Sequence, residues 1–188
     1  MHIPLQIILI ATLLILLAAV PATAPSQPAP AEPTFVDLPA MQLAGVATYG
    51  HPSDGSFAKL WYAFDSVVQK SEGLRTDRYG YGVEMYPPNW QAQQKWGYLV
   101  GCEVADASRV AAYLVRCELP AGRYAVFRVP GGIEGIPDAY HWIYHTWLPI
   151  SGYALAHPLD VERHVLDPNV KSPAEHVVEI LLPVRKKT

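Results

Sequence analysis

The sequence contains few of the features that mark common enzyme classes. It has only two cysteines among 188 residues, and they do not form a Cys-x-x-Cys motif, so a dithiol redox centre is not indicated. The chain has no Gly-x-Ser-x-Gly motif, and its glycine-rich stretch at Gly131, Gly132 and Gly135 lacks the Lys-Ser/Thr ending of a phosphate-binding loop. With 14 Lys and Arg against 17 Asp and Glu, the formal net charge is −3, which argues against nucleic acid as a partner.

Charge is also missing from the start of the chain. Residues 3–20 are almost wholly apolar and contain no Asp, Glu, Lys or Arg, and Ala22-Thr23-Ala24 fits the small-x-small pattern at which signal peptidase cuts. Residues 1–24 therefore indicate a signal peptide and predict a periplasmic or secreted protein. The first six residues carry no Lys or Arg, and 18 apolar residues are just long enough to cross a bilayer, so a retained membrane anchor at residues 3–20 is the alternative. Residues 25–34, rich in Pro and Ala, are expected to form a linker.

The two cysteines, Cys102 and Cys117, lie on either side of an expected hairpin. Export to an oxidising compartment would allow a cross-strand disulfide between them. The alternative is that both are small buried apolar residues, and the sequence leaves the two readings open.

The rest of the chain contains one pattern twice. Leu38-Pro39-Ala40 returns as Leu119-Pro120-Ala121, an offset of 81 residues, and each copy is followed by a turn and an apolar, aromatic helix. We expect the first helix over Ser56–Lys70 and the second to begin at Pro137-Asp138, with an offset of 83 between them. After the helices, strands are expected over Tyr79–Tyr86 and Trp96–Val104 in the first copy. Val83–Tyr86 aligns with Val161–His164 at an offset of 78, which makes Glu84 the equivalent of Glu162, and Trp96–Val104 aligns with His176–Val184 at an offset of 80.

These repeats predict the α+β class, with tandem pseudo-symmetric β-α-β-β units that form a mostly antiparallel sheet of about eight strands. Two helices are expected to pack over this sheet. We expect one long first strand over Phe35–Thr48 and a short helical connection over Asp106–Ala112. Residues 35–185 make up the predicted domain.

Six segments in this order resemble the GyrI-like effector-binding domain found in AraC-type and MerR-type regulators: LPAMQLAGV, WGYLVGCEV, LPAGRYAVF, YHWIYHTWLPISGY, DVERHVLDP and HVVEILLPV. The resemblance covers residues 35 to 184. It implies two pseudo-symmetric units around a groove that holds lipophilic, often cationic, ligands, and a ligand-facing glutamate in a strand of the pattern apolar-Glu-x-Tyr. Val161-Glu162-Arg163-His164 matches this pattern except that His164 replaces the tyrosine.

Glu162 is therefore the leading candidate for the ligand-binding acid. A carboxylate in an apolar, aromatic groove favours a cationic ligand, because burial costs solvation energy that a cation offsets, and aromatic faces add cation–π attraction. The alternative for Glu162 is a solvated position on the exposed side of its strand. The full set of candidate ligand-binding residues is Glu162, Tyr140, Tyr144, Trp147, Trp61, Trp96, Glu84 and His164.

The sequence thus predicts an exported or membrane-tethered module that senses or sequesters a small amphipathic molecule, with no cofactor and no metal. The alternative is a hydrolase of small electrophilic compounds that uses Glu162 as its acid, as some members of the family do. Haem binding through His141, His145 or His164, by analogy with the related SOUL proteins, is a third hypothesis. His141 and His145 have the i, i+4 spacing of zinc ligands but lack a nearby Cys or acid, so solvated histidines are the favoured interpretation.

Overall fold

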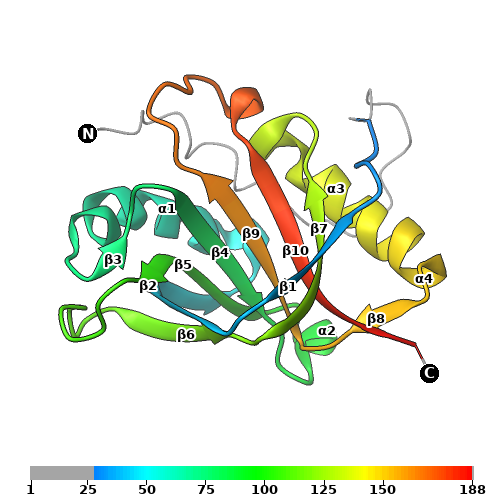
Figure 1. Ribbon diagram of the computed structural model, residues 1–188, viewed down its shortest axis with the longest axis horizontal. Coiled ribbons are helices and arrows are strands. Elements are labelled where there is room, and N and C mark those ends of the chain that lie inside the picture. The colour runs from blue at the N-terminus through cyan, green and yellow to red at the C-terminus, as the bar shows by residue number, and fades with distance from the viewer. Residues whose placement is uncertain (1–27, 188) are drawn as a thin grey trace.

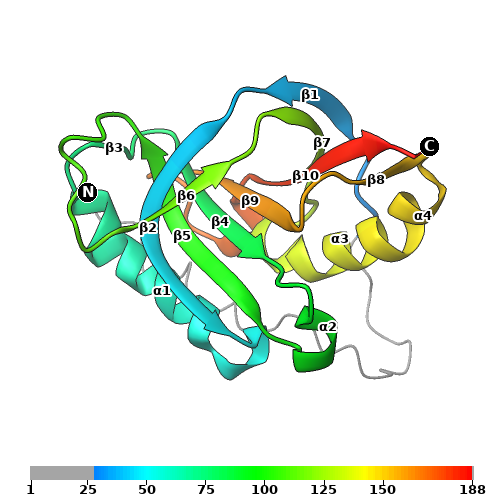
Figure 2. The ribbon, with the colours of Figure 1, turned by 90° about the horizontal axis from the view of Figure 1, so that it is seen from below.

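The computed structural model describes residues 28–187, which form a curled antiparallel sheet with its helices on one face (Figures 1 and 2). The principal strands run in the order β1-β7-β10-β9-β4-β5-β2-β6, while β3 pairs with β5 and β8 with β10. The strands of the first half are β1 (Thr34–Leu38), β2 (Met41–Gly50), β3 (Leu74–Arg75), β4 (Tyr79–Met85) and β5 (Trp96–Val104). Those of the second half are β6 (Val115–Leu119), β7 (Gly122–Arg128), β8 (Tyr153–Leu155), β9 (Leu159–Val165) and β10 (Val178–Lys186).

Each half contributes one principal helix, and both helices pack on the same face of the sheet (Figure 2). Helix α1 (Ser56–Ser66) is followed by a single 3-10 turn, Val68–Lys70. In the second half, α3 (Ile136–Trp142) continues through a π-helical turn, Ile143–Trp147, into α4 (Leu148–Ile150). A short helix, α2 (Trp90–Gln93), lies in the hairpin between β4 and β5 (Figure 1).

The π-helical turn has a cause in the sequence. Leu148 donates its backbone N–H to the carbonyl of Ile143, five residues back, instead of to Tyr144. Pro149 has no N–H to give to the carbonyl of His145, and its ring crowds that carbonyl. One wide turn before the proline relieves this crowding, as is typical of π-bulges.

The two halves correspond strand by strand, so the predicted duplication and the predicted α+β class are confirmed. The sheet order reads the same from either end when β1, β2, β4 and β5 are exchanged with β6, β7, β9 and β10. The offset is 81 residues from β1 to β6 and from β2 to β7, and 80 from β4 to β9, as their first residues show (115 − 34, 122 − 41 and 159 − 79). The repeating unit is thus β-β-α-β-β-β rather than β-α-β-β, because the sequence pattern did not distinguish the first strand of each unit, β1 or β6, or the short strand after the helix, β3 or β8.

Each half gives its first strand to the other half. Strand β1 precedes β2 in the chain but pairs with β7, and β6 precedes β7 but pairs with β2. The expected single strand over Phe35–Thr48 is therefore wrong: Pro39 and Ala40 separate β1 from β2, and the chain crosses there from one half to the other. Proline, which has no N–H for a sheet ladder, fits this break.

Three apolar cores hold the sheet. One lies between α1 and the strands β2 and β5, and a second lies between α3 and the strands β7 and β10. The third occupies the opposite face and is shared by both halves, because alternate residues of every long strand point to it. Strands β2 and β5 approach each other closely where Gly45 faces Gly101, since a Cβ on Gly45 would lie 2.0 Å from the carbonyl oxygen of Val100.

Two further expectations are corrected. Residues 106–112 form turns and not a helix. Cys102 and Cys117 do not flank a hairpin, because β2 lies between their strands, with Ala44 paired to Cys102 and Leu43 paired to Cys117. Cys102 packs in the core under α1, whereas Cys117 packs against the core of the opposite face, and both are free thiols. The strands that carry the two cysteines are separated by two strand spacings, about 10 Å, which is too far for a disulfide bond.

Within residues 28–187, no helix combines the length and the apolar character needed to span a membrane. The predicted signal peptide or anchor at residues 1–24 lies outside the described residues.

Candidate functional site

The candidate site lies where the two halves meet, on β4 and β9 at the centre of the sheet. In the antiparallel register, Gly82 faces Glu162 and Glu84 faces Asp160. Because side chains alternate along a strand, these residues all point to the helical face, while Val83 and Val161 point to the core on the other side. With the offset of 80, Gly82 and Glu162 are equivalent positions as well as direct neighbours, so the pseudo-twofold axis passes between them.

Asp160 is completely buried and accepts hydrogen bonds from three tyrosine hydroxyls. Tyr140 Oη lies 2.9 Å from Oδ1, while Tyr144 Oη and Tyr86 Oη lie 2.7 and 3.0 Å from Oδ2. Burial raises the pKa of Asp160 to about 6, and the three hydroxyls oppose that rise by stabilising the carboxylate. The helix through Tyr140 and Tyr144 is therefore bonded to the centre of the sheet by a charged group.

Glu84 lies beside Asp160 and shares Tyr86 with it. Tyr86 Oη is 2.5 Å from Glu84 Oε2. Burial raises the pKa of Glu84 well above its usual value, and the neighbouring Asp160 and Glu162 raise it further. The indole N–H of Trp96 approaches Glu84 closely enough to oppose this rise, yet it is buried and makes no hydrogen bond within residues 28–187.

Glu162 is also buried, with 7% of its surface exposed, so the alternative of a solvated position on an exposed strand face is wrong. Its Oε2 lies 3.2 Å from Tyr98 Oη and 3.2 Å from His164 Nε2. Trp61 of α1 donates its indole N–H to Tyr98 Oη at 3.1 Å, and its ring contacts the His164 imidazole at 4.4 Å between centroids. A chain of hydrogen bonds therefore runs from the first helix through Tyr98 to Glu162.

The cluster carries an unbalanced set of acids. Among residues 28–187, no lysine or arginine forms an ion pair with Glu84, Asp160 or Glu162, and the sole basic partner is the His164 imidazole. Buried carboxylates are ordinarily paired with a cation or coordinated to a metal. The site therefore has an excess of buried acid that the protein itself does not neutralise.

Aromatic rings surround these acids. Phe57 stacks on Tyr98 at 4.5 Å between centroids, and Tyr86 contacts both Trp90 at 4.9 Å and Trp96 at 5.6 Å. Tyr86, Trp90 and Tyr144 are only partly buried, unlike the other members. We call these three residues the rim, because they are the part of the cluster that meets solvent.

The structure brings together seven of the eight candidate residues. Tyr140 and Tyr144 bind Asp160, while Trp61, His164, Glu84 and Trp96 surround the acids as described above. Trp147 is the exception, because it packs against Phe127, Phe35 and Tyr153 in the core under α3. The expected offset of 83 between the helices misplaced it. At an offset of 79, buried Phe57, Trp61, Phe64 and Val68 coincide with buried Ile136, Tyr140, Ile143 and Trp147, so Trp147 corresponds to Val68.

The expected equivalence of Glu84 and Glu162 at offset 78 is likewise wrong. At the observed offset of 80, Glu84 corresponds to His164, and Glu162 corresponds to Gly82. Both acids nevertheless belong to the site, because the strands that carry them are neighbours.

Four members of the site were not predicted: Asp160, Tyr86, Tyr98 and Trp90. The signal for Asp160 was available, since it lies two residues before Glu162 in a strand and therefore shares its face. By the same argument Tyr86 accompanies Glu84. Tyr98 lies two residues after the candidate Trp96 in β5, so the same argument would have found it. Trp90 comes from the short helix α2, and no spacing within the sequence links it to Glu162.

The histidines considered for metal or haem have other positions. His141 and His145 are exposed on the helix and contact each other, with 4.6 Å between ring centroids. No group of three or more His, Cys, Asp or Glu side chains within residues 28–187 has the arrangement of a metal site.

The doubled α+β unit and its curled sheet agree with the family resemblance found in the sequence. The chain belongs to the family of GyrI-like small molecule binding domains, whose sequence profile matches residues 31–185.

Similar proteins include a curated relative and solved structures. The transcriptional regulator BrlR of Pseudomonas aeruginosa is 28% identical over 141 residues, which cover 72% of this chain and 51% of BrlR, so the chain spans about half the length of that relative. SAV2435, solved bound to tetraphenylphosphonium, superposes with a TM-score of 0.65 at 13% identity over 82% of this chain and 94% of its own. The C-terminal domain of EcmrR superposes with a TM-score of 0.63 at 18% identity over 82% and 97%. At 13% and 18% identity, the two solved structures show only that the fold is shared.

Proposed function

We propose that this domain binds lipophilic organic cations at the acid cluster and acts as a sensing or sequestration module. The observation that carries the proposal is the group of three buried carboxylates, Glu84, Asp160 and Glu162, with no lysine or arginine paired to them among residues 28–187. A cation that enters such a site recovers electrostatic energy that burial has cost the acids. The surrounding rings supply apolar area and cation–π attraction of about 0.5–2 kcal/mol per desolvated contact.

The comparison with SAV2435 supports the ligand class. That protein was solved with tetraphenylphosphonium, a lipophilic cation with four aromatic rings and a fixed charge. The same compound is the natural first probe for this chain, because it has no titratable group and no hydrogen-bond donor. Its recognition would rest on charge and ring contacts only.

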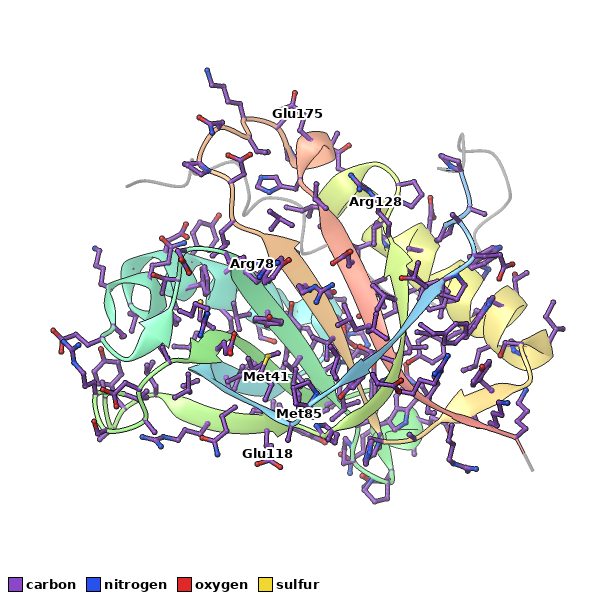
Figure 3. All side chains as sticks on the ribbon, in the orientation of Figure 1. Met41, Arg78, Met85, Glu118, Arg128 and Glu175 are labelled. Carbon is purple, nitrogen blue, oxygen red and sulfur yellow. The ribbon has the colours of Figure 1, made fainter. Side chains whose placement is uncertain are left out.

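Calorimetric titration of the purified chain with tetraphenylphosphonium tests the proposal. We expect saturable binding that is lost or weakened at least tenfold in Glu162→Gln, which keeps the shape of the side chain and removes its charge. Glu118→Gln is the matched control, because Glu118 is exposed and points outward from β6 (Figure 3). Triphenylphosphine oxide, a neutral aromatic compound, should bind more weakly than the cation.

Two results would contradict this function. Equal affinity for the cation in the wild type and in Glu162→Gln would remove the acid from recognition. Hydrolysis of an activated ester by the wild type, absent in Glu162→Gln, would favour the alternative of a hydrolase.

We also propose that the domain works outside the cytoplasm, either released after residue 24 or held at the membrane by residues 3–20. The support is the uncharged apolar run and the Ala22-Thr23-Ala24 pattern that follows it. Mass spectrometry of the protein from fractionated cells should find a mature chain that begins at residue 25, or an intact chain in the membrane fraction. An intact chain in the cytoplasmic fraction would overturn the proposal.

A further inference from the structure

We propose that the acid cluster holds one exchangeable proton on Glu84 when it is empty, and that a bound organic cation displaces this proton. The inference rests on the proposed function and adds a coupling between ligand and proton. Its basis is the number of hydrogen atoms available for the contacts that Tyr86 makes with Glu84 and Asp160.

The hydroxyl of Tyr86 contacts both acids, with Oη 2.5 Å from Glu84 Oε2 and 3.0 Å from Asp160 Oδ2. A hydroxyl has one hydrogen, so it can donate to only one of them. The other contact, between two oxygen atoms, is favourable only if that carboxyl carries a hydrogen of its own. The geometry therefore requires one proton on one of the two acids.

The surroundings assign this proton to Glu84. Asp160 also accepts hydrogen bonds from Tyr140 and Tyr144, which stabilise it as a carboxylate. Among the described residues, Glu84 has one hydroxyl partner, Tyr86, and beside it only the Trp96 indole N–H, which approaches Glu84 without forming a hydrogen bond. The consistent arrangement is a chain in which protonated Glu84 donates to Tyr86 and Tyr86 donates to Asp160.

Among the groups that face Glu84 from the neighbouring elements, the two acids favour the same assignment, and the Trp96 indole N–H opposes it. Strand β9 contributes the acids Asp160 and Glu162, with His164 beyond Glu162, and β5 contributes Tyr98 and the Trp96 indole. The second-half helix contributes Tyr140 and Tyr144. Burial and the two neighbouring acids both raise the pKa of Glu84 well above its usual value.

Exchange follows from charge balance. Protonated Glu84 plus a cation in solution gives ionised Glu84 beside the bound cation, plus a proton that passes to the buffer. One positive charge enters and one leaves, so the net charge of the site does not change. By linkage, affinity for the cation rises with pH, up to about tenfold per unit where Glu84 is protonated in the free protein and ionised in the complex.

The test counts protons. Tetraphenylphosphonium does not titrate, so every proton released on binding comes from the protein. Titrations at pH 7 in buffers of different ionisation enthalpy should show release of close to one proton per ligand, and the affinity should rise from pH 6 to pH 8. In Glu84→Gln, an isostere of the protonated acid, binding should be weaker, proton release close to zero, and affinity nearly independent of pH. Glu118→Gln should behave as the wild type.

Infrared difference spectra of the wild type provide a second measurement that needs no variant at the site. The carbonyl band of a protonated carboxylic acid should disappear when the cation binds. Binding without proton release and without loss of this band would overturn the exchange and leave the proposed function intact. A wild type that does not bind the cation at all would overturn both.

Discussion

Gly82 is the residue whose small size gives Glu162 its surroundings. A Cβ at this position would lie 2.4 Å from Tyr98 Oη and 3.2 Å from Glu162 Oε2, so any larger residue would occupy the space in which these two side chains meet. Its φ angle is not in the left-handed region, and the requirement is therefore one of volume rather than of backbone conformation.

We expect Gly82→Ala to destabilise the fold by about 1–3 kcal/mol, the usual cost of overpacking, and to weaken binding of tetraphenylphosphonium because Tyr98 is displaced from Glu162. Urea unfolding and calorimetry measure the two effects.

Gly97→Ala is the matched control, since the nearest atom to its Cβ is the flexible end of Met85 at 3.3 Å. It should change the free energy of unfolding by no more than about 0.5 kcal/mol in either direction. If the two alanine variants were equally stable, the steric argument for Gly82 would fail.

At this scale the sequence predicted individual residues only where a strand pattern or a family motif pointed to them. Glu162 was found through its motif, and Glu84 through a repeat alignment that was itself two residues out of register. Asp160 was missed although it shares a strand face with Glu162. The register of β4 against β9, which sets Glu84 opposite Asp160, is a property of the folded sheet.

At the scale of elements, aromatic rings are brought to the acid cluster by α2 and the second-half helix as well as by α1, which carries Trp61. The long helix of the second half supplies Tyr140 and Tyr144, one turn apart, and both hydroxyls bond to Asp160. The short helix α2 supplies Trp90, which contacts Tyr86 and Trp96 at the rim. Helix α2 has only four residues, and the residue that caps it, Gln94, is a non-glycine residue with φ of 54°. It is therefore an irregular helix.

Replacement of Trp90 tests the role of the rim. We expect Trp90→Ala to weaken binding of tetraphenylphosphonium about 3- to 10-fold, through loss of one ring contact, and to leave proton release unchanged because the Glu84–Tyr86–Asp160 chain stays intact. Tyr62→Ala, which removes an aromatic ring that is 43% exposed on α1, serves as the control and should bind normally. Normal binding by Trp90→Ala would show that the ligand does not contact α2.

The principal helices and the longer strands were predicted close to their observed bounds, because their apolar residues recur with clear helical or strand periods. The short strands β3 and β8, with two and three residues, carry no such period. Helix α2 was missed for the same reason. The π-helical turn depends on Pro149, whose effect on the preceding carbonyls is hard to read from a sequence alone.

At the scale of the whole molecule, the exchanged strands join the halves. Strand β1 completes the sheet of the second half and β6 completes that of the first, while β4 and β9 pair directly at the centre. The core on the face opposite the helices contains residues from both halves. Neither half can close its own sheet edge or bury its own share of that core.

We therefore expect the domain to unfold in a single cooperative transition. Urea titrations followed by tryptophan fluorescence and by far-ultraviolet circular dichroism should coincide, and removal of β1 should destabilise the second half as much as the first. Two separate transitions, or a stable fold in an isolated half, would show that the exchanged strands do not couple the unfolding of the two halves.

The duplication itself was visible in the sequence because its motifs recur at nearly constant spacing. The exchange of strands was not, because spacing along the chain does not reveal which strand pairs with which. The family resemblance predicted the doubled architecture, whereas the arrangement of the three acids follows from the register of β4 and β9 in the folded sheet.

The axis between Gly82 and Glu162 limits how alike the two copies can be. Duplication of a gene copies every codon, yet these two facing positions cannot both carry a glutamate side chain, because a side chain at residue 82 would fill the space in which Tyr98 and Glu162 meet. One copy had to give up its side chain for the other to keep an acid. A ligand with a single charged end consequently meets unequal surroundings across the axis, with the Glu162 side chain on β9 and no side chain at Gly82 on β4, and we expect it to bind in one orientation instead of two.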